Sequence, residues 1–269
     1  MGFVLSRLER IFRFLWGGWS GVAGLALLAA LWQAGHETYG DFILSAPLAT
    51  FTAVAALLAE AETWRLAAET TARALQGFGL SALTGGAAGI AAGYSPATMR
   101  LARPLITVIL GVPPIAWIVL AMIWFGATDG TVVVTVAVGT LPVLFAGAAE
   151  GVAARDRGLD AMAEAFGAGP LRRFLTVGLR QVLMHLFPAL ILGLGSAFKV
   201  AVMAELLANA GGIGGALALA RANLDIAEAL AWVILTVAAL VAVEYGLIHP
   251  VRAELERWRE AARPWGVKR

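Results

Sequence analysis

The chain has 269 residues, of which 60% are hydrophobic and only 14% carry a charge at neutral pH. Soluble globular domains are about 45–50% apolar and about 25% charged, so this balance excludes a soluble protein and indicates an integral membrane protein. The absence of cysteine excludes disulfides and thiolate metal sites, and a net charge of +2 gives no reason to expect a nucleic-acid-binding surface.

Uncharged apolar runs predict helices that cross the membrane, because about 20 apolar residues span a bilayer and the alternating segments of a barrel are missing. In chain order we expect six spans, at 14–34, 66–93, 105–126, 131–153, 182–208 and 227–249. The predicted fold class is therefore all-α integral membrane. Residues 1–13 form an N-terminal segment, 14–250 a six-helix domain and 251–269 a C-terminal tail.

The basic residues give the orientation. Three precede the first span, two lie between the second and third, five lie in 155–180 and six follow the last span, which makes 16 of the 20 Lys and Arg on one side. By the positive-inside rule both termini, the 94–104 loop and 155–180 are cytoplasmic, in a plasma (inner) membrane. The alternative, that the first span is a cleaved signal peptide, would invert every later loop against this count.

On the outer side, residues 47–64 predict a short helix that begins at Pro47 and lies along the interface, or an ordinary connecting helix. At the outer end of span two, Glu69 and Arg73 are spaced for a local ion pair. The same span carries a face of small residues at every fourth position, which predicts close packing within the subunit or between two copies. The members of this face are Gly77, Ser81, Gly85, Gly89 and Gly93.

Gly111–Val112–Pro113–Pro114 interrupts span three, because each proline removes a backbone donor. We expect a kink in mid-membrane, which either borders a cavity or is an architectural bend. After span five, glycines at 211, 212, 214 and 215 predict a flexible turn that could belong to an external gate.

Lys199 lies in the apolar stretch SAFKVAVMA, where an ammonium group must face protein, a counter-charge or water. It either attracts an anion in a translocation path or pairs with Glu150 or Glu244. Glu205 lies about 240° further around the same helix and is not a same-face partner. The candidates for the lining of a path are Pro113, Pro114, Trp117, Lys199, Glu205 and Asn209.

Sequence motifs of catalysis are missing. No G-x-x-x-x-G-K-[ST] loop occurs that could hold ATP, the three histidines form no metal spacing, and no nucleophile elbow is present. We therefore expect a chain that is not an enzyme and holds neither cofactor nor metal.

The segment 155–180, here called the loop, is a charged island between two spans. Gly167–Ala168–Gly169–Pro170 ends one helix and begins another, so the loop is expected to fold as helix, corner and helix. A small, nearly bare corner would fit a groove on a partner in the cytoplasm. Arg172 and Arg173 behind it could pair with acidic groups there.

Within the loop, Ala161 to Gly167 followed after nine residues by Val177–Gly178–Leu179–Arg180 resembles the EAA–x3–G–x9–I–x–L–P signature of ABC importer permeases. Ala161 replaces the usual glutamate and Arg180 the usual proline, which puts in doubt any ion pair that the family makes there. Asp160 or Glu164 could substitute. The segments FILSAPLATFTAVAALLAE, ARPLITVILGVPPIAWIVLAMIWFG and KVAVMAELLANAGGIGGALALAR, and residues 70–95, resemble the nitrate/taurine/aliphatic-sulfonate class of these permeases, and the likeness runs from about 42 to 252.

This resemblance implies a type I importer permease, a homodimer of six-helix subunits with two ATPase subunits that bind ATP and Mg²⁺, fed by a periplasmic solute-binding protein. It implies a small anionic substrate such as a sulfonate, nitrate or bicarbonate, although other members carry pyrimidines or aromatic acids. The residues it assigns to ATPase coupling are Glu164, Ala165, Gly167, Ala168, Gly169, Pro170, Leu171, Arg172 and Arg173.

Two other functions remain open from the residues. An ion-coupled secondary transporter would use Lys199, Glu205 and Glu244 as a relay, although the sequence has no evident inverted repeat and such a transporter leaves the loop without a task. A membrane scaffold that transports nothing is the second alternative.

Overall fold

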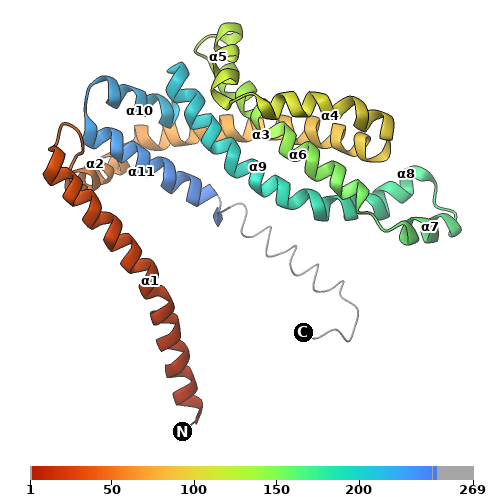
Figure 1. Ribbon diagram of the computed structural model, residues 1–269, viewed down its shortest axis with the longest axis horizontal. Coiled ribbons are helices and arrows are strands. Elements are labelled where there is room, and N and C mark those ends of the chain that lie inside the picture. Colours follow the sequence, from red (N-terminus) through yellow and green to blue (C-terminus); the bar gives the residue numbers. More distant parts are fainter. Residues whose placement is uncertain (1, 244, 247–269) are drawn as a thin grey trace.

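The computed structural model describes residues 2–243, 245 and 246; within 2–20 it describes only one side chain, Trp19. Every regular element in these residues is a helix (Figure 1). The helices are α1 (Gly2–Tyr39), α2 (Pro47–Ala59), α3 (Ala61–Tyr94), α4 (Pro96–Gly111), α5 (Pro114–Phe125), α6 (Asp129–Ala153), α7 (Arg157–Ala165), α8 (Pro170–Arg173), a π-helical turn (Phe174–Gly178), α9 (Leu179–Ala208), α10 (Gly212–Ala222) and α11 (Ile226–Val243).

The centre of the molecule is a layer of three long helices, α3, α6 and α9; α3 lies along the longest axis, and α6 and α9 run obliquely to it (Figure 1). The small-residue face of α3 lies directly on α6. A Cβ atom added to Gly77 would meet Val136, one added to Gly85 would meet the Leu141 carbonyl, and one added to Gly93 would meet Val152. The residue numbers of the two helices rise together, so α3 and α6 are parallel. The predicted close packing is therefore confirmed, and it lies within the subunit.

Helix α9 packs on α6 in the opposite direction. Gly147 of α6 faces Ala189, and Gly151, further along α6, faces Val182, so one number rises as the other falls. Predicted spans two, four and five thus run in the relative directions that alternate crossing of a membrane requires. Their shared core contains buried Val136 of α6 and Phe198 of α9. Apolar side chains from α5, α10 and α11 pack against them.

The predicted interruption of span three at Pro113–Pro114 is present, but it is a break between two helices and not a kink in one continuous helix. Two separate helices, α4 and α5, meet at an angle of 94°. Val112 and Pro113 are both extended, with ψ of 123° and 142°. Each of them precedes a proline, and the ring of a following proline disfavours the helical conformation. The Pro113–Pro114 pair therefore ends one helix and begins the next instead of bending a continuous one.

Among the described residues, three helices are long and apolar enough to cross a membrane, or four if the bent pair α4–α5 counts as one span. The three are α6, the run Pro170–Ala208 and α11. The end of the sixth predicted span, including Glu244, and the predicted tail 251–269 lie outside the described residues. Helix α1 contains the first predicted span and projects away from the helical layer (Figure 1).

The segment after α1 also contains a helix. Helix α2 begins at Pro47, as predicted, and ends at Ala59. The segment that connects α1 to α2 is held against α1, because the Trp32 indole donates a hydrogen bond to the Ser45 carbonyl at 2.9 Å.

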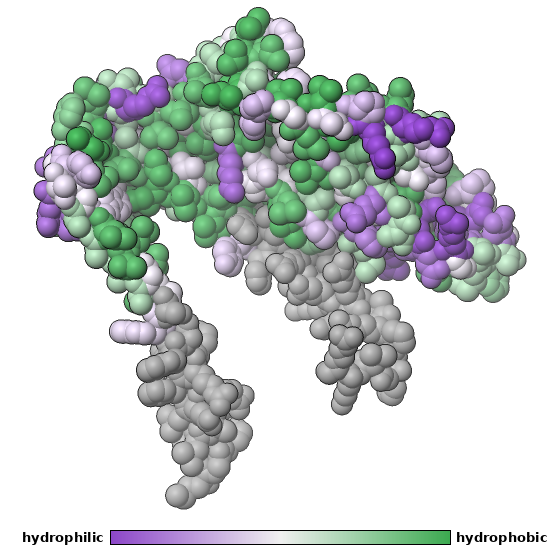
Figure 2. Space-filling model, in the orientation of Figure 1, coloured by the Kyte–Doolittle hydropathy of each residue, from purple (hydrophilic) through white to green (hydrophobic). Residues whose placement is uncertain are grey.

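The surface changes character along the molecule. Figure 2 shows hydrophobic residues over the middle of the elongated body and hydrophilic residues gathered at the end formed by α7 and α8. The exposed apolar side chains of the middle include Leu105, Val108 and Ile123, each more than 60% exposed. Such a surface suits lipid and not water, whereas the α7–α8 end suits an aqueous phase.

Candidate functional site

The loop 155–180 has the predicted helix, corner and helix. Asp156 begins α7 by accepting a hydrogen bond from the Gly158 N–H at 2.7 Å, the usual role of an N-cap carboxylate. At the other end, Gly167 adopts φ of +75°, a conformation that glycine enters without steric cost. The Ala168 N–H then returns to the Ala163 carbonyl at 3.0 Å and completes the cap. Pro170 occupies the first turn of α8.

An ion pair closes the corner from behind. Arg173 Nη1 of α8 lies 2.6 Å from Glu164 Oε2 of α7. Arg173 therefore binds within the loop, which differs from the expectation that both arginines would face a partner. Arg172 is exposed. The glutamate that the signature expects at position 161 is absent, and in this structure the acidic side chain that holds the corner is Glu164.

The Gly167–Pro170 corner itself carries no large side chain, but exposed apolar side chains flank it. Phe166 is 85% exposed and Leu171 is 70% exposed, one on each side of the glycine turn. Met162, half exposed, extends this apolar tip along α7. We call Met162, Phe166 and Leu171 the loop tip. A water-facing segment that presents three large apolar side chains has a surface suited to a protein partner.

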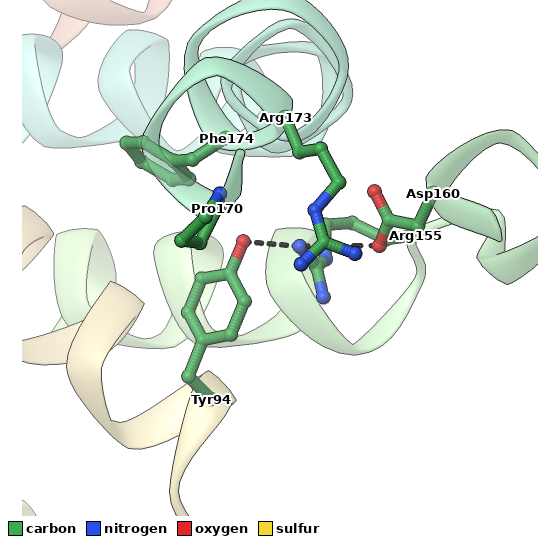
Figure 3. A pocket seen from close by; sticks show the side chains of 6 residues that line it. All are labelled: Tyr94, Arg155, Asp160, Pro170, Arg173 and Phe174. Atoms are coloured by element: carbon green, nitrogen blue, oxygen red, sulfur yellow. Dashed lines mark hydrogen bonds and ion pairs between the residues drawn. The ribbon is translucent and has the colours of Figure 1, made fainter. Parts of the chain in front are cut away.

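At the base of the loop lies a cavity of about 350 Å³ (Figure 3). Its lining is Tyr94, Arg155, Asp160, Pro170, Arg173 and Phe174. These residues come from the end of α3, the segment after α6, α7, α8 and the π-helical turn, so the cavity marks the point where the loop meets the membrane helices.

The candidates for a translocation path fall into two groups. Lys199 is exposed, together with Leu192, Ser196, Met203 and Leu207, at the spacing of one face of α9. We call these five residues the α9 stripe. Lys199 forms no ion pair within the part of the chain that the structure describes, so the expected partner Glu150 is not one; the alternative partner Glu244 lies outside that part.

Glu205 belongs to the other group. Its side chain is fully buried and faces away from the α9 stripe, so the expectation that it lines the same path as Lys199 is not met. Its carboxylate lies 2.7 Å from Arg73 Nη1 and accepts hydrogen bonds from the Thr70 hydroxyl at 2.8 Å and the Gly214 N–H at 3.1 Å. Because Lys199 and Glu205 are on different faces, the proposed ion relay lacks a direct link between them.

Arg73 connects a fourth helix to this buried network. Its Nη2 lies 2.8 Å from Asp129 Oδ1 at the start of α6, whereas its distance to Glu69 Oε2 is 3.8 Å. The predicted local pair with Glu69 thus exists but is the longest of its three contacts. Arg73 and Glu205 are 132 positions apart, and the sequence signal for them was only that two opposite charges lie near the outer ends of two spans.

The same network explains the glycine cluster, which is not a flexible turn. A Cβ atom on Gly214 would lie 2.6 Å from Glu205 Cβ and 2.7 Å from the Leu206 nitrogen. The glycines let the start of α10 approach α9 so closely that the Gly214 N–H reaches the buried carboxylate, and the start of a helix is a favourable place for a negative charge. The Ile213 N–H adds a hydrogen bond to Thr70 at 2.9 Å.

An exposed charge pair precedes this network on α3. Arg65 forms hydrogen bonds with Glu62 that hold the pKa of the Glu62 carboxyl below its usual value, and the same pairing raises the pKa of Arg65. Both side chains are more than half exposed, so this pair contributes little to stability.

The other path candidates lie at helix ends. Asn209 ends α9 in the left-handed conformation, with φ of 51°, and is exposed. Pro113 and Pro114 are exposed at the start of α5, and Trp117 is partly buried on that helix, which packs on α6 and α9. Among the described residues, no three His, Asp or Glu side chains come together in a way that could hold a metal ion.

Comparison with known proteins identifies the class of this molecule. The chain is 29% identical to the putative aliphatic sulfonates transport permease protein SsuC of Escherichia coli over 189 residues, which cover 70% of this chain and 72% of that protein. It is 28% identical to the taurine transport system permease protein TauC of Escherichia coli, over 58% of this chain and 56% of TauC. It is 26% identical to the nitrate import permease protein NrtB of Leptolyngbya laminosa, over 56% and 54% of the two chains.

A solved structure agrees with this in its fold. A chain of the MetNI methionine ABC transporter, in an inward-facing conformation, superposes with a TM-score of 0.58, covering 76% of this chain and 97% of that chain at 19% sequence identity. Residues 85–245, more than half of the chain, match the family of the binding-protein-dependent transport system inner membrane component. The chain belongs to this family and is a permease subunit of an ABC transporter, a membrane component that carries no catalytic site of its own.

Proposed function

We propose that the chain forms the translocation path of an importer for a small anion, such as a sulfonate, nitrate or bicarbonate. A periplasmic solute-binding protein delivers the anion, and separate ATPase subunits that bind ATP and Mg²⁺ supply the energy. Two copies of the chain form the membrane part as a homodimer. The single observation that carries this proposal is the loop, a braced helical corner with an apolar tip on a membrane protein.

The docking role rests on the shape of the loop. The Glu164–Arg173 ion pair and the glycine cap fix the angle between α7 and α8, so the loop tip is presented on a rigid support. Exposed Phe166 and Leu171 provide the large apolar contacts that commonly carry the free energy of a protein interface. The loop tip therefore fits a groove on the ATPase subunit.

The path itself rests on the α9 stripe. A helix that is part of a membrane span and exposes Lys199, with no ion partner among the described residues, needs water, an anion or a second subunit beside it. In a homodimer the two stripes can face a shared path, in which two ammonium groups attract an anion. The similarity to sulfonate, taurine and nitrate permeases supports the same class of substrate.

We further propose six crossings of the inner membrane, by α1, α3, the α4–α5 pair, α6, α9 and α11, with both termini in the cytoplasm. The parallel packing of α3 on α6 and the antiparallel packing of α9 on α6 support this alternation. It places the loop in the cytoplasm and the Arg73–Glu205 ion pair near the outer surface.

The test is retention of an ATPase subunit. The tagged chain, expressed with its neighbouring transport genes, is purified in mild detergent, and the amount of ATPase subunit that stays bound is measured. Phe166→Asp should reduce retention at least about tenfold, because hot-spot contacts contribute 2 kcal/mol or more. The matched control is Leu224→Asp, which changes a leucine that is 62% exposed and expected on the outer side.

Retention by the wild type and by Leu224→Asp, with loss by Phe166→Asp, supports the docking assignment. An unchanged amount of ATPase with Phe166→Asp contradicts it. ATP-independent uptake driven by a proton gradient through the isolated chain would instead favour the secondary transporter.

A further inference from the structure

Two membrane helices, α3 and α6, and the loop meet at one pair of side chains. Tyr94 is the last residue of α3, and Arg155 follows the end of α6. The Arg155 guanidinium lies over the Tyr94 ring, 4.2 Å from its centroid, and also donates a hydrogen bond to the Tyr94 hydroxyl. The two side chains therefore interact in two ways, by a cation–π contact with the ring and by a hydrogen bond to the hydroxyl group.

Arg155 also contacts α7 and the end of α6. Its Nη1 lies 3.4 Å from Asp160 Oδ2 of α7, and its Nε donates to the Val152 carbonyl of α6 at 3.3 Å. The Arg155 side chain is only 17% exposed, although it lies at the aqueous end of the molecule. One arginine thus joins α3, α6 and α7, and Figure 3 shows the Tyr94–Arg155 pair beside the cavity.

The third part of the joint is the π-helical turn that connects α8 to α9. Its first residue, Phe174, packs edge-on against Tyr94 with ring centroids 6.1 Å apart. Its last residue, Gly178, is buried against the pair, and an added Cβ would lie 3.2 Å from the Tyr94 hydroxyl and 3.4 Å from Arg155 Nη1. A π-helical turn inside a helix marks a local departure from regular geometry and is frequent at functional sites.

The cavity gives this joint room to change. About 350 Å³ of space lies among Tyr94, Arg155, Phe174 and the start of α8, at the place where the loop would turn relative to the membrane helices. A packed interior resists such a movement, whereas a cavity beside a π-helical turn permits it. The loop stays connected to α3 through Tyr94, which contacts both Arg155 and Phe174.

We propose that Tyr94 and Arg155 are positioning residues that transmit movement of the loop to α3, with the π-helical turn Phe174–Gly178 as the hinge. This rests on the proposed docking of an ATPase subunit on the loop. When the docked loop moves, Arg155 carries the end of α3 with it through the ring contact and the hydrogen bond. Movement of α3 then reaches the outer end, where Arg73 binds Asp129 and Glu205.

The experiment separates docking from transmission. The natural chain has no cysteine, so Ala68→Cys places a single thiol on the exposed outer part of α3. The complex with its co-purified ATPase subunit is reconstituted in nanodiscs, and the rate of labelling by a maleimide is measured with and without trapping by ATP and vanadate. Basal ATP hydrolysis and ATPase retention are measured on the same samples.

In the parent chain, trapping should change the labelling rate at position 68 at least about fivefold, the lower range of allosteric coupling. Arg155→Lys keeps the charge but loses the planar stacking, and Tyr94→Leu loses both contacts; each should reduce this change to less than about twofold while retention and basal hydrolysis stay as in the parent. Tyr94→Phe keeps the ring and should retain most of the change. The matched controls are Arg100→Lys on exposed α4 and Tyr39→Phe on α1.

A full response in Arg155→Lys and Tyr94→Leu overturns the proposal, and so does a parent chain whose labelling rate does not respond to trapping. Loss of ATPase retention in these two variants, with normal retention in the controls, also overturns it, because the pair would then support docking alone. Failure of the proposed function has a different sign: no ATPase subunit co-purifies with the parent chain.

Discussion

Removal of the Arg73 guanidinium should destabilise the fold more than any substitution of an exposed charge. Arg73→Met leaves the Glu205 carboxylate, which is fully buried, without its cation. The hydrogen bonds from Thr70 and Gly214 remain, but they do not neutralise a full charge. A buried ion pair that loses one partner costs about 3–5 kcal/mol.

The expected loss of stability depends on how exposed the arginine side chain is. The Arg73 side chain is 11% exposed. Arg65 pairs with two carboxylates of its own helix, and its side chain is 58% exposed. Arg65→Met should therefore cost at most about 1 kcal/mol. For a chain of this length each kcal/mol shifts Tm by about 2–4 °C, so Arg73→Met should lower Tm by about 6–20 °C and Arg65→Met by less than about 4 °C.

Glu205→Gln in the Arg73→Met background gives the sharper test. The amide oxygen can still accept from Thr70 and Gly214, while the uncompensated charge is gone, so at least half of the lost Tm should return. Fluorescence-detected size-exclusion chromatography after heating measures all variants in detergent. An Arg73→Met protein as stable as Arg65→Met, or a further loss of Tm in the double variant, would refute the reasoning.

Two further predictions each compare two glycine substitutions, and a third concerns Lys199. Gly89→Ala should cost about 1–3 kcal/mol, since its Cβ would lie 2.8 Å from Ala148 Cβ, whereas Gly86→Ala, with nothing within 4 Å, should be neutral or stabilising by Tm. Gly214→Ala should likewise lower Tm by several degrees and Gly215→Ala, whose nearest atom is at 3.9 Å, should not; equal effects within either pair would contradict the close packing. Lys199→Met should reduce uptake of methanesulfonate and nitrate about tenfold or more at unchanged Tm, and normal uptake of both would remove Lys199 from the path.

Much of the fold was predictable because it depends on local patterns. The face of small residues from Gly77 to Gly93 predicted close helix packing, since such spacing permits close approach of two helices, and the structure identifies α6 as the partner. Gly167 and Pro170 predicted the corner of the loop through turn chemistry, and the structure adds Asp156 as the N-cap of α7. These signals lie within a few residues of the structure that they determine.

The parts that were missed depend on contacts between distant residues. No local pattern joins Arg73 to Glu205, and without that pair the glycines at the start of α10 indicate flexibility and not a tight approach to a buried carboxylate. The bend at Pro113 was expected, but its 94° angle depends on how α5 packs against α6 and α9. The exposed position of Phe166 depends on the rotation of α7, which a short helix does not reveal by its sequence period.

Cross-linking from the loop tip tests the central claim most directly. Phe166 is replaced by a photo-reactive phenylalanine derivative in the complete transporter, which keeps the aromatic ring at an 85% exposed position. Irradiation should link the chain to an ATP-binding subunit, and the same derivative at Phe51 on α2, which we propose lies on the outer side, should not give this product. Efficient cross-links from position 166 to lipid or to another copy of the chain, with none to an ATP-binding subunit, would contradict the account.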